Sequence, residues 1–334
     1  MQDIASYLEG VIKADNRTEL CKSVIPGLIG AINSISNVLQ NSHEVSLVGT
    51  ANAFGDDQLN VDVEAESVIR SAITKCPAII TASSEEDPVE RTVAHVNQEG
   101  SNDNYSSKEK YTVAFDPLDG SSIIAPNWAV GTIIGIWEGD TALNQMPSSS
   151  QIASILGVYG PRTTVIVAVR IPGQTPILFE AGLEADKPKD FHVIRPEIKF
   201  SDPPYPTRYF APANLRYAAE SEAYMNLINH YIKEKYTLRY AGGLVPDVVH
   251  MLVKGHGVFV SPVGAGKAKL RRLYELCPIA LIMECAMGVA TDPVTGTQIL
   301  SKPVADCDER GGLICGNLEE GKFAIKELAP LSKP

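Results

Sequence analysis

The sequence predicts an α/β protein in which β-sheets lie between layers of helices. Apolar residues recur with a helical period over two stretches near the start of the chain, and the second half alternates helix-like with strand-like segments. With 334 residues, 44% of them hydrophobic and 21% charged, the chain can bury a sizeable core. At about 150 residues per domain, its length suggests two domains. The Pro-rich segment 201–206 is the best candidate boundary, giving expected domains 1–200 and 201–334.

The first half is expected to place helices against a large antiparallel or mixed sheet. Apolar residues recur at steps of three and four over 24–39, where Pro26 fits the first turns of a helix, and again over 61–73. Strands are expected at 78–81, 111–115, 130–137, 163–171 and 176–182. The polar stretch 97–109 is expected to be a surface loop.

The second half alternates short strands with helices. Strands are expected at 208–211, near 237 and at 257–261, and helices over 218–235, 245–254 and 270–287. Such alternation predicts a second α/β layer stacked on the first.

Composition and charge exclude several classes of function. A net charge of -11 argues against nucleic-acid binding, since that affinity depends on clustered Lys and Arg. No apolar run approaches the ~18 residues that a membrane-spanning helix needs, because even 278–290 is interrupted by Glu284. The N-terminal residues resemble neither a signal peptide nor a transit peptide, so the cytoplasm is the expected location. The six cysteines form no C-x-x-C pair, which predicts reduced, mostly buried thiols rather than a zinc site or a disulfide framework.

The segment 115–122, F-D-P-L-D-G-S-S, carries the clearest chemical signal. Asp116 and Asp119 follow a predicted strand, and Pro117 and the next turn restrict where they point. Two such carboxylates can hold a hard divalent cation through oxygen, and residues 120–122 can open a helix whose free N–H groups bind phosphate. An Asp-Gly turn with a Ser cap is the ordinary alternative, but the full run is more specific than that.

Two further acidic groups lie upstream. Glu85 and Glu86 follow the strand expected at 78–81, and in isolation they indicate a solvated loop. Beside Asp116, however, two strand ends of one sheet can bring four carboxylates together, where like charges need solvent or metal. The third group comprises Asp56, Asp57 and Asp62. It precedes the second helix, where an N-cap at Asp62 and a catalytic role are equally open.

The segment 267–275 combines basic side chains with a glutamate. Lys269 and Arg271 can bind phosphate or sugar, and Glu275 lies one helical turn beyond Arg271. The alternative is an ordinary salt-bridged amphipathic helix. The run 264–267 lacks the first Gly of a P-loop, and Ala268 stands where Ser or Thr is required, so a nucleoside triphosphate site is not expected.

Together these segments resemble the class I fructose-1,6-bisphosphatase family within the lithium-sensitive phosphatases. The resemblance rests on 115–122, with 84–86 upstream and 269–275 downstream. It extends from about Leu47 to Lys322. Segments 159–164, 212–216 and 234–248 resemble the sedoheptulose-bisphosphatase branch of the family more closely. The resemblance implies an αβαβα five-layer fold with two stacked sheets, and a homo-oligomer, either a dimer or a tetramer.

The resemblance also implies roles for individual residues. The metal ligands would be Glu85, Asp116, Asp119, Glu275 and the carbonyl of Leu118, with Asp57 or Asp56 near a further metal. Asp62 and Glu86 would orient and deprotonate the attacking water. Gly120, Ser121 and Ser122 would hold the transferred phosphoryl group; Asn214, Tyr217, Tyr240 and Arg239, the last from a neighbouring subunit, would hold the distal phosphate; Gly243, Leu244, Lys269 and Arg271 would be further substrate contacts. Two or three Mg²⁺ ions, or Mn²⁺ in their place, would bind in each active site.

The implied reaction is hydrolysis of the 1-phosphate of sedoheptulose-1,7-bisphosphate to sedoheptulose-7-phosphate. Uncatalysed phosphomonoester hydrolysis is very slow, and clustered metals can neutralise phosphoryl charge, generate hydroxide and stabilise the leaving alkoxide. Fructose-1,6-bisphosphatase or dual activity is the alternative. A non-catalytic metabolite-binding scaffold is a further one, against which the retained carboxylates and the Lys269 and Arg271 pair argue. A nucleic-acid or membrane partner is not expected.

Three departures from the family pattern bear on specificity and regulation. Ser261 stands where fructose-bisphosphatases carry Tyr, which enlarges the sugar pocket and favours the seven-carbon sugar. The stretch 49–55 lacks the cysteine-containing insert of light-regulated chloroplast enzymes, and Ala125 stands where the family usually has Asp. We therefore expect no thioredoxin control, and the N-terminal region shows no AMP-binding motif.

Overall fold

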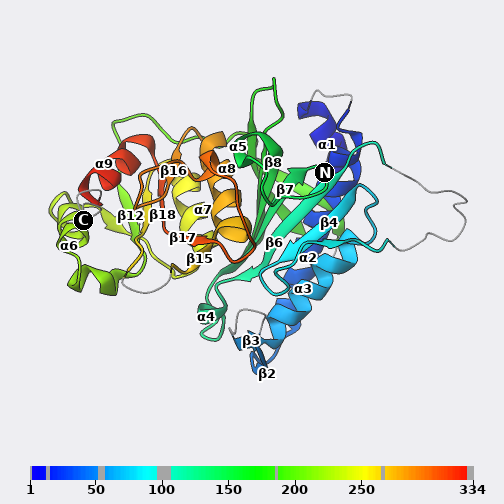
Figure 1. The fold of residues 1–334 in the computed structure, drawn as a ribbon, viewed down its shortest axis with the longest axis horizontal. Coiled ribbons are helices and arrows are strands. Elements are labelled where there is room, and N and C mark those ends of the chain that lie inside the picture. The colour runs from blue at the N-terminus through cyan, green and yellow to red at the C-terminus, as the bar shows by residue number, and fades with distance from the viewer. Residues whose placement is uncertain are drawn as a thin grey trace, which may run out of the picture.

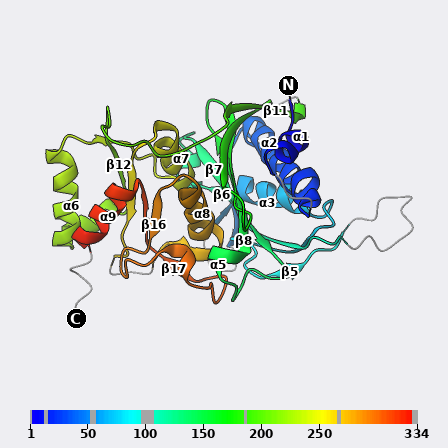
Figure 2. The same cartoon turned by 90° about the horizontal axis from the view of Figure 1, so that it is seen from above.

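Two stacked sheets alternate with layers of helices in the computed structural model, which describes residues 2–12, 16–51, 57–95, 107–184, 187–264 and 268–328. The outer face of the larger sheet is covered by α1 (Ile4–Val11), α2 (Ile25–Asn41) and α3 (Asn60–Ile73) (Figure 1). Between the sheets lie α7 (Leu244–Lys254) and α8 (Cys277–Cys285), and beyond the smaller sheet lie α6 (Glu222–Lys233) and α9 (Leu318–Leu328) (Figure 2). This order of layers, α-β-α-β-α, confirms the expected fold class.

The larger sheet has nine strands in the order β1-β11-β10-β9-β8-β7-β6-β4-β5. Their bounds are β1 (Gln2–Asp3), β4 (Ile79–Ser84), β5 (Arg91–Thr92), β6 (Tyr111–Asp119), β7 (Val130–Glu138), β8 (Gln151–Tyr159), β9 (Thr163–Val169), β10 (Ile177–Glu184) and β11 (Lys187–Arg195). Among the described pairs, β4 runs parallel to β6 and all others are antiparallel, so the sheet is mixed as expected. The sequence did not predict β8 or β11, since Ser154 and Gly157 interrupt the first and charged residues begin the second.

The smaller sheet has five strands in the order β13-β12-β14-β18-β16. Their bounds are β12 (Tyr209–Pro212), β13 (Thr237–Leu238), β14 (Val258–Ser261), β16 (Val289–Thr291) and β18 (Leu313–Gly316). Two short ribbons complete the strands, β2 (Leu47–Ala51) with β3 (Asp57–Leu59), and β15 (Leu270–Arg271) with β17 (Arg310–Gly311). Short helices are α4 (Ser121–Ile124) and α5 (Pro147–Ser150).

Two helices expected in the second half are shorter than the sequence indicated. The helix expected over 218–235 begins only at Glu222, because Ser221 accepts a hydrogen bond from the N–H of Tyr224 at 3.2 Å and caps it. A 3₁₀ turn, Leu215–Ala219, precedes it. The helix expected over 270–287 starts instead with β15 and a π-helical turn, Arg272–Leu276, and becomes regular where Pro278 fits a first helical turn.

The two halves of the chain share a core. The larger sheet is built from residues before 196 and the smaller from residues after 208, but α7 and α8 pack against β7 and β8 as well. The division into domains 1–200 and 201–334 therefore stays a prediction. All six cysteines are free and buried, as expected. Most of the loop expected at 97–109 lies outside the described residues. No helix in the described part of the chain has both the length and the apolarity to cross a membrane.

Candidate active site

Two acidic segments meet because β4 and β6 are parallel neighbours. Ser84 pairs with Phe115, and the N–H of Glu85 donates to the carbonyl of Phe115 at 3.0 Å. Parallel strands end at the same edge of a sheet. The chain therefore delivers Glu85 and Glu86 from one strand and Asp116 from the other to one place.

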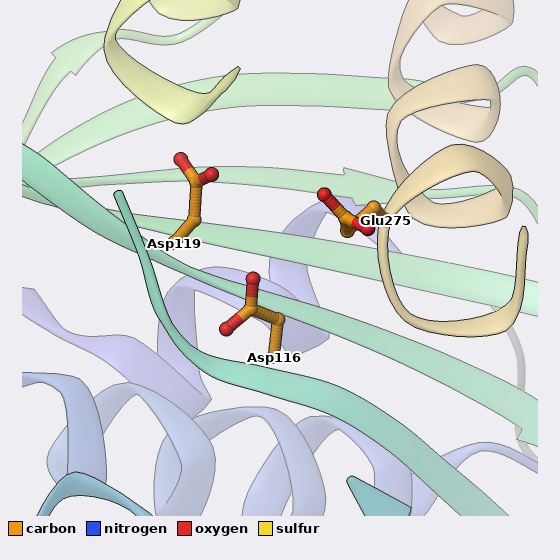
Figure 3. Close-up of side chains that lie close together, drawn as sticks. All are labelled: Asp116, Asp119 and Glu275. Carbon is orange, nitrogen blue, oxygen red and sulfur yellow. The ribbon is translucent and has the colours of Figure 1, made fainter. Parts of the chain in front are cut away.

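Three carboxylates from β6 and the π-helical turn share one space. One ligand oxygen each from Asp116, Asp119 and Glu275 lies within 4.8 Å of the others, and all three residues are buried. Figure 3 shows the two aspartates on β6 and the glutamate approaching from the turn that precedes α8. Residues more than 150 positions apart in the sequence thus form one acidic centre.

Electrostatics make this centre unfavourable without a cation. Burial raises the pKa of the Asp119 carboxyl to about 6 and that of Glu275 to about 8. Burial, followed by the charges of Asp119 and Glu275, also raises the pKa of Asp116 well above its usual range. Because hard divalent cations prefer carboxylate oxygens, these residues fit a bound divalent cation.

Backbone donors fix the direction of each carboxylate. Asp116 accepts a hydrogen bond from the N–H of Leu118 at 3.0 Å, and Glu275 accepts one from the N–H of Arg271 at 2.5 Å. Asp119 accepts hydrogen bonds from the N–H groups of Leu244 at 3.2 Å and Val245 at 2.7 Å, in the first turn of α7. The three side chains are therefore pre-oriented, as a metal site requires.

Arg271 forms an ion pair with Glu85 and is buried. From the family resemblance, Arg271 was expected to contact substrate and Glu85 to bind metal. In the structure the two side chains instead contact each other at the edge of the acidic centre. The pair supplies a positive charge beside a cluster of carboxylates, and both expected roles stay predictions.

Asp62 lies near Glu86 and is buried. Of the two roles left open for Asp62, the N-cap is ruled out, because Leu59 occupies that position and the Asp62 side chain, three residues later, accepts the N–H of Leu59 at 3.0 Å. The other carboxylate oxygen of Asp62 has no hydrogen-bond partner among the described residues. Burial, with a smaller contribution from Glu86, raises the pKa of Asp62 to about 7. Glu86 accepts a hydrogen bond from Gln58 at 2.5 Å.

Helix α3 also holds the turn that carries Glu85 and Glu86. Glu66, one helical turn after Asp62, accepts hydrogen bonds from Arg70 at 2.7 Å and from the Ser84 hydroxyl at 2.8 Å. The Ser84 hydroxyl in turn accepts the N–H of Asp87 at 3.0 Å. We call Glu66, Arg70, Ser84 and Asp87 the α3 clamp. This clamp was not predicted from the sequence, although Ser84 directly precedes Glu85 and Glu86, two of the predicted site residues.

The segment expected to hold the transferred phosphoryl group forms one short turn. Gly120 has a φ of 99°, which favours glycine, and α4 begins at the next residue. Ser121 and Ser122 are exposed there, and Leu118 is buried just before them. Asp56 and the side chain of Asp57 lie outside the described part of the structure, so their expected place near a metal stays a prediction.

A pocket of about 370 Å³ collects several of the expected substrate contacts. Asn214, Tyr217, Ser261 and Lys269 all line it. Arg216 and Glu220, which the sequence analysis did not select, line it too. Both residues lie in the short segment after β12 that also carries Asn214 and Tyr217, and this position in the sequence could have indicated that they line the pocket.

Other expected substrate contacts lie outside this pocket. Arg239 and Tyr240 are exposed and are not among its lining residues. Gly243 and Leu244 are buried at the start of α7, and the N–H of Leu244 is one of the two donors to Asp119. Asp247 was missed, although it holds the preceding loop by accepting the N–H groups of Ala241 at 2.5 Å and Gly242 at 3.1 Å.

Comparison with known proteins places this geometry in a family. Residues 8–182 match the model of the fructose-1-6-bisphosphatase N-terminal domain, and residues 204–328 match that of the C-terminal domain. The chain belongs to the fructose-1,6-bisphosphatase family. This membership confirms the expected resemblance and the expected enzyme class, a phosphoric monoester hydrolase that acts on sugar phosphates.

Individual relatives carry two different names. A chloroplastic sedoheptulose-1,7-bisphosphatase of Chlamydomonas reinhardtii is 39% identical over 320 residues, covering 94% of this chain and 75% of the relative. A class 1 fructose-1,6-bisphosphatase of Syntrophotalea carbinolica is 32% identical over 308 residues, covering 89% and 87%. A crystal structure of a candidate sedoheptulose-1,7 bisphosphatase from Toxoplasma gondii has a TM-score of 0.83 at 34% identity, covering 99% of this chain and 100% of that one.

Proposed function

We propose that this protein hydrolyses the 1-phosphate of sedoheptulose-1,7-bisphosphate, using water and divalent magnesium. The observation that carries the proposal is the buried cluster of Asp116, Asp119 and Glu275. Three carboxylates held this close are unfavourable unless protons or cations compensate them. Such cations beside a phosphate-binding turn would suit hydrolysis of a phosphomonoester, and the segment 120–122, directly after β6, would supply that turn.

Two observations favour the seven-carbon sugar as substrate: sequence identity to relatives named for it, and the small side chain of Ser261 in the pocket. The relatives named for sedoheptulose-1,7-bisphosphate are 37% and 39% identical to this chain, against 32% for the fructose-named relative given above. The small side chain of Ser261 lines the pocket that also contains Asn214 and Tyr217. Fructose-1,6-bisphosphate is the alternative substrate, since the matched family is named for it.

Separate groups of residues would bind the metal ions and accept the proton of the attacking water. Glu85, Asp116, Asp119, Glu275 and the carbonyl of Leu118 would hold two or three Mg²⁺ ions, or Mn²⁺ in their place. When bound, such cations neutralise phosphoryl charge and lower the pKa of water. Asp62 has a free carboxylate oxygen and a pKa of about 7, so at neutral pH it can accept a proton from the attacking water.

The substrate would be held at both ends. N–H and hydroxyl groups of Gly120, Ser121 and Ser122 would bind the phosphoryl group that is transferred, while Glu86 helps Asp62 to orient the water. Lys269 lines the pocket and can contact the sugar, and Asn214 and Tyr217 can contact the distal phosphate. Holding both ends aligns the scissile bond with the water, which accounts for a large part of many enzymatic rate enhancements.

One kinetic comparison tests the proposal. The purified protein is assayed for phosphate release from sedoheptulose-1,7-bisphosphate and fructose-1,6-bisphosphate, with Mg²⁺ and with EDTA. We expect Mg²⁺-dependent release and a higher kcat/KM for the seven-carbon sugar. A tenfold preference for fructose-1,6-bisphosphate would overturn the substrate assignment. Absence of release from either sugar would instead support a non-catalytic scaffold. A cytoplasmic location and a homo-oligomeric state stay predictions of the sequence.

A further inference from the structure

We propose that Arg216 binds the distal phosphate of the substrate and contributes to selection of bisphosphates over monophosphates. This inference rests on the proposed function, because it assigns one end of the substrate to the pocket lined by Asn214, Tyr217, Ser261 and Lys269. Arg216 is a basic side chain on the wall of that pocket. It would be a residue that determines substrate specificity without taking part in the chemical step.

The backbone beneath Arg216 is held firmly. Arg216 lies in the 3₁₀ turn Leu215–Ala219, which begins after Asn214 in the left-handed region at a φ of 50°. The N–H of Tyr217 donates to the carbonyl of Asn214 at 2.9 Å, and the N–H of Ser221 donates to the carbonyl of Tyr217 at 2.9 Å. A guanidinium on such a turn loses little backbone entropy when it binds a ligand.

The opposite wall of the pocket, residues 261–264, lies close to the turn that carries Arg216. Asn214 donates to the carbonyl of Pro262 at 3.4 Å. A Cβ atom at Gly264 would lie 3.3 Å from the amide nitrogen of Asn214 and 3.4 Å from the ring of Tyr217, so glycine allows this close approach. The pocket is therefore shaped by two segments, 214–220 and 261–264, that meet across it.

The charge of the pocket suits one phosphate. Among its described lining residues, Arg216 and Lys269 are basic and Glu220 is acidic. Arg216 forms no hydrogen bond or ion pair within the described part of the chain, so its guanidinium is available. Glu220 would repel an anion, which places the phosphate on the side of Arg216 and Lys269 and leaves Glu220 to face sugar hydroxyls or solvent. A planar guanidinium matches the geometry of phosphate oxygens better than a point charge does.

The pocket has room for the distal end of a seven-carbon sugar. Its volume of about 370 Å³ lies within the range of small-molecule sites. Lys269 lines the pocket and is two residues from Arg271, which pairs with Glu85, so one short segment leads from the pocket wall to the residues beside the acidic centre. A seven-carbon bisphosphate carries its second phosphate one carbon farther away than a six-carbon one. With Ser261 rather than a large side chain on the wall, the distal phosphate can extend to Arg216.

The test compares Arg216→Ala and Arg216→Lys with the unaltered enzyme. Substrates are sedoheptulose-1,7-bisphosphate and p-nitrophenyl phosphate, which lacks a distal phosphate. Loss of one charge-assisted, bidentate contact should lower kcat/KM for the bisphosphate about 10- to 100-fold, mainly through KM. Arg216→Lys should recover part of the loss, and hydrolysis of the aryl phosphate should be unchanged. Lys233→Ala, which removes an exposed positive charge from α6, is the matched control and should behave like the unaltered enzyme.

The outcomes separate this inference from the proposed function. If the unaltered enzyme cleaves the bisphosphate and Arg216→Ala cleaves it equally well, the assignment of Arg216 is wrong and the proposed function stands. An equal loss on both substrates would also overturn it, because it would indicate general damage to the site. Absence of bisphosphate cleavage by the unaltered enzyme would overturn the proposed function and this assignment together.

Discussion

The backbone N–H of Val245 donates to the carboxylate of Asp119 at 2.7 Å, so one residue of the candidate metal site also holds the first turn of α7. The loop before α7 is held in the same turn, since Asp247 accepts the N–H groups of Ala241 and Gly242. The acidic centre and a loop expected to contact substrate are therefore attached to one helix end. A substitution of Asp119 should therefore also alter the position of the loop before α7.

Asp119→Asn should abolish most activity while leaving the fold intact. The amide keeps one acceptor oxygen for α7 but loses the negative charge that a divalent cation needs. Loss of a metal ligand should lower kcat at least about 100-fold. Removing one of three clustered charges offsets the lost hydrogen bond, so the melting temperature without Mg²⁺ should change little. Circular dichroism and a phosphate-release assay check this, and near-normal turnover would contradict the site assignment.

The metal-free protein should become less stable as pH rises from 5.5 to 8.5. Burial raises the folded-state pKa of Asp62 to about 7 and that of Glu275 to about 8, above the values near 4 that are usual for unfolded chains. Between the unfolded-state pKa and the folded-state pKa of each carboxyl, the folded state binds more protons than the unfolded state, so the free energy of unfolding falls as pH rises. Below a pH of about 4 the carboxyls are protonated in both states, and this pH dependence disappears.

Thermal melts in EDTA and in Mg²⁺ across that pH range test this prediction. Bound Mg²⁺ should flatten the decline, because a cation compensates the carboxylates once they ionise. The range avoids lower pH, where Glu309 and Glu320, whose pKa values are lowered by their hydrogen-bond partners despite burial, begin to lose their own stabilising contribution. A melting temperature in EDTA that stays constant or rises from pH 5.5 to 8.5 would be incompatible with the acidic centre described here.

Ser84→Ala should slow catalysis without much effect on substrate affinity. The Ser84 hydroxyl links Glu66 of α3 to the N–H of Asp87, and the residues between Ser84 and Asp87 are Glu85 and Glu86. Loosening this turn should lower kcat about 10-fold and raise the Mg²⁺ concentration for half-maximal activity, with KM little changed. Ser71→Ala on the exposed side of α3 is the control. If Ser84→Ala changes the melting temperature but not the Mg²⁺ requirement, the α3 clamp has a structural role only.

Much of the site could be predicted because its residues follow recognisable strand ends. β-branched runs before Glu85 and Asp116 indicated both strands, and α2 and α3 were visible from their apolar period. That β4 and β6 are parallel neighbours could not be derived from periodicity, because strand pairing depends on long-range packing. The layer order came from family resemblance for the same reason.

The rest of the site depends on contacts that local sequence does not encode. The ion pair of Arg271 with Glu85 joins segments far apart in the chain, and β15, a two-residue strand, replaces the first turn of an expected helix. The N-cap at Leu59 was missed because it has no capping side chain, and Asp62 satisfies its N–H from inside the helix. Tertiary partners overrode local propensity at each of these positions.

Ser261→Tyr should shift substrate preference toward the six-carbon sugar. Ser261 ends β14 and lines the pocket with Asn214, Tyr217 and Arg216, so a tyrosine ring there would occupy volume that the longer substrate needs. We expect the ratio of kcat/KM for sedoheptulose-1,7-bisphosphate to that for fructose-1,6-bisphosphate to fall about 10-fold, the scale of discrimination that a steric change in a pocket produces.

Two measurements make that result specific. Ser261→Ala keeps the space open and should retain the original ratio, which separates the effect of volume from loss of the hydroxyl. Hydrolysis of p-nitrophenyl phosphate, which does not reach the pocket, should be the same in both variants. If Ser261→Tyr lowered kcat/KM for the two sugars by the same factor, the pocket would not discriminate between six-carbon and seven-carbon substrates. Preference for the seven-carbon sugar would then have to depend on other residues.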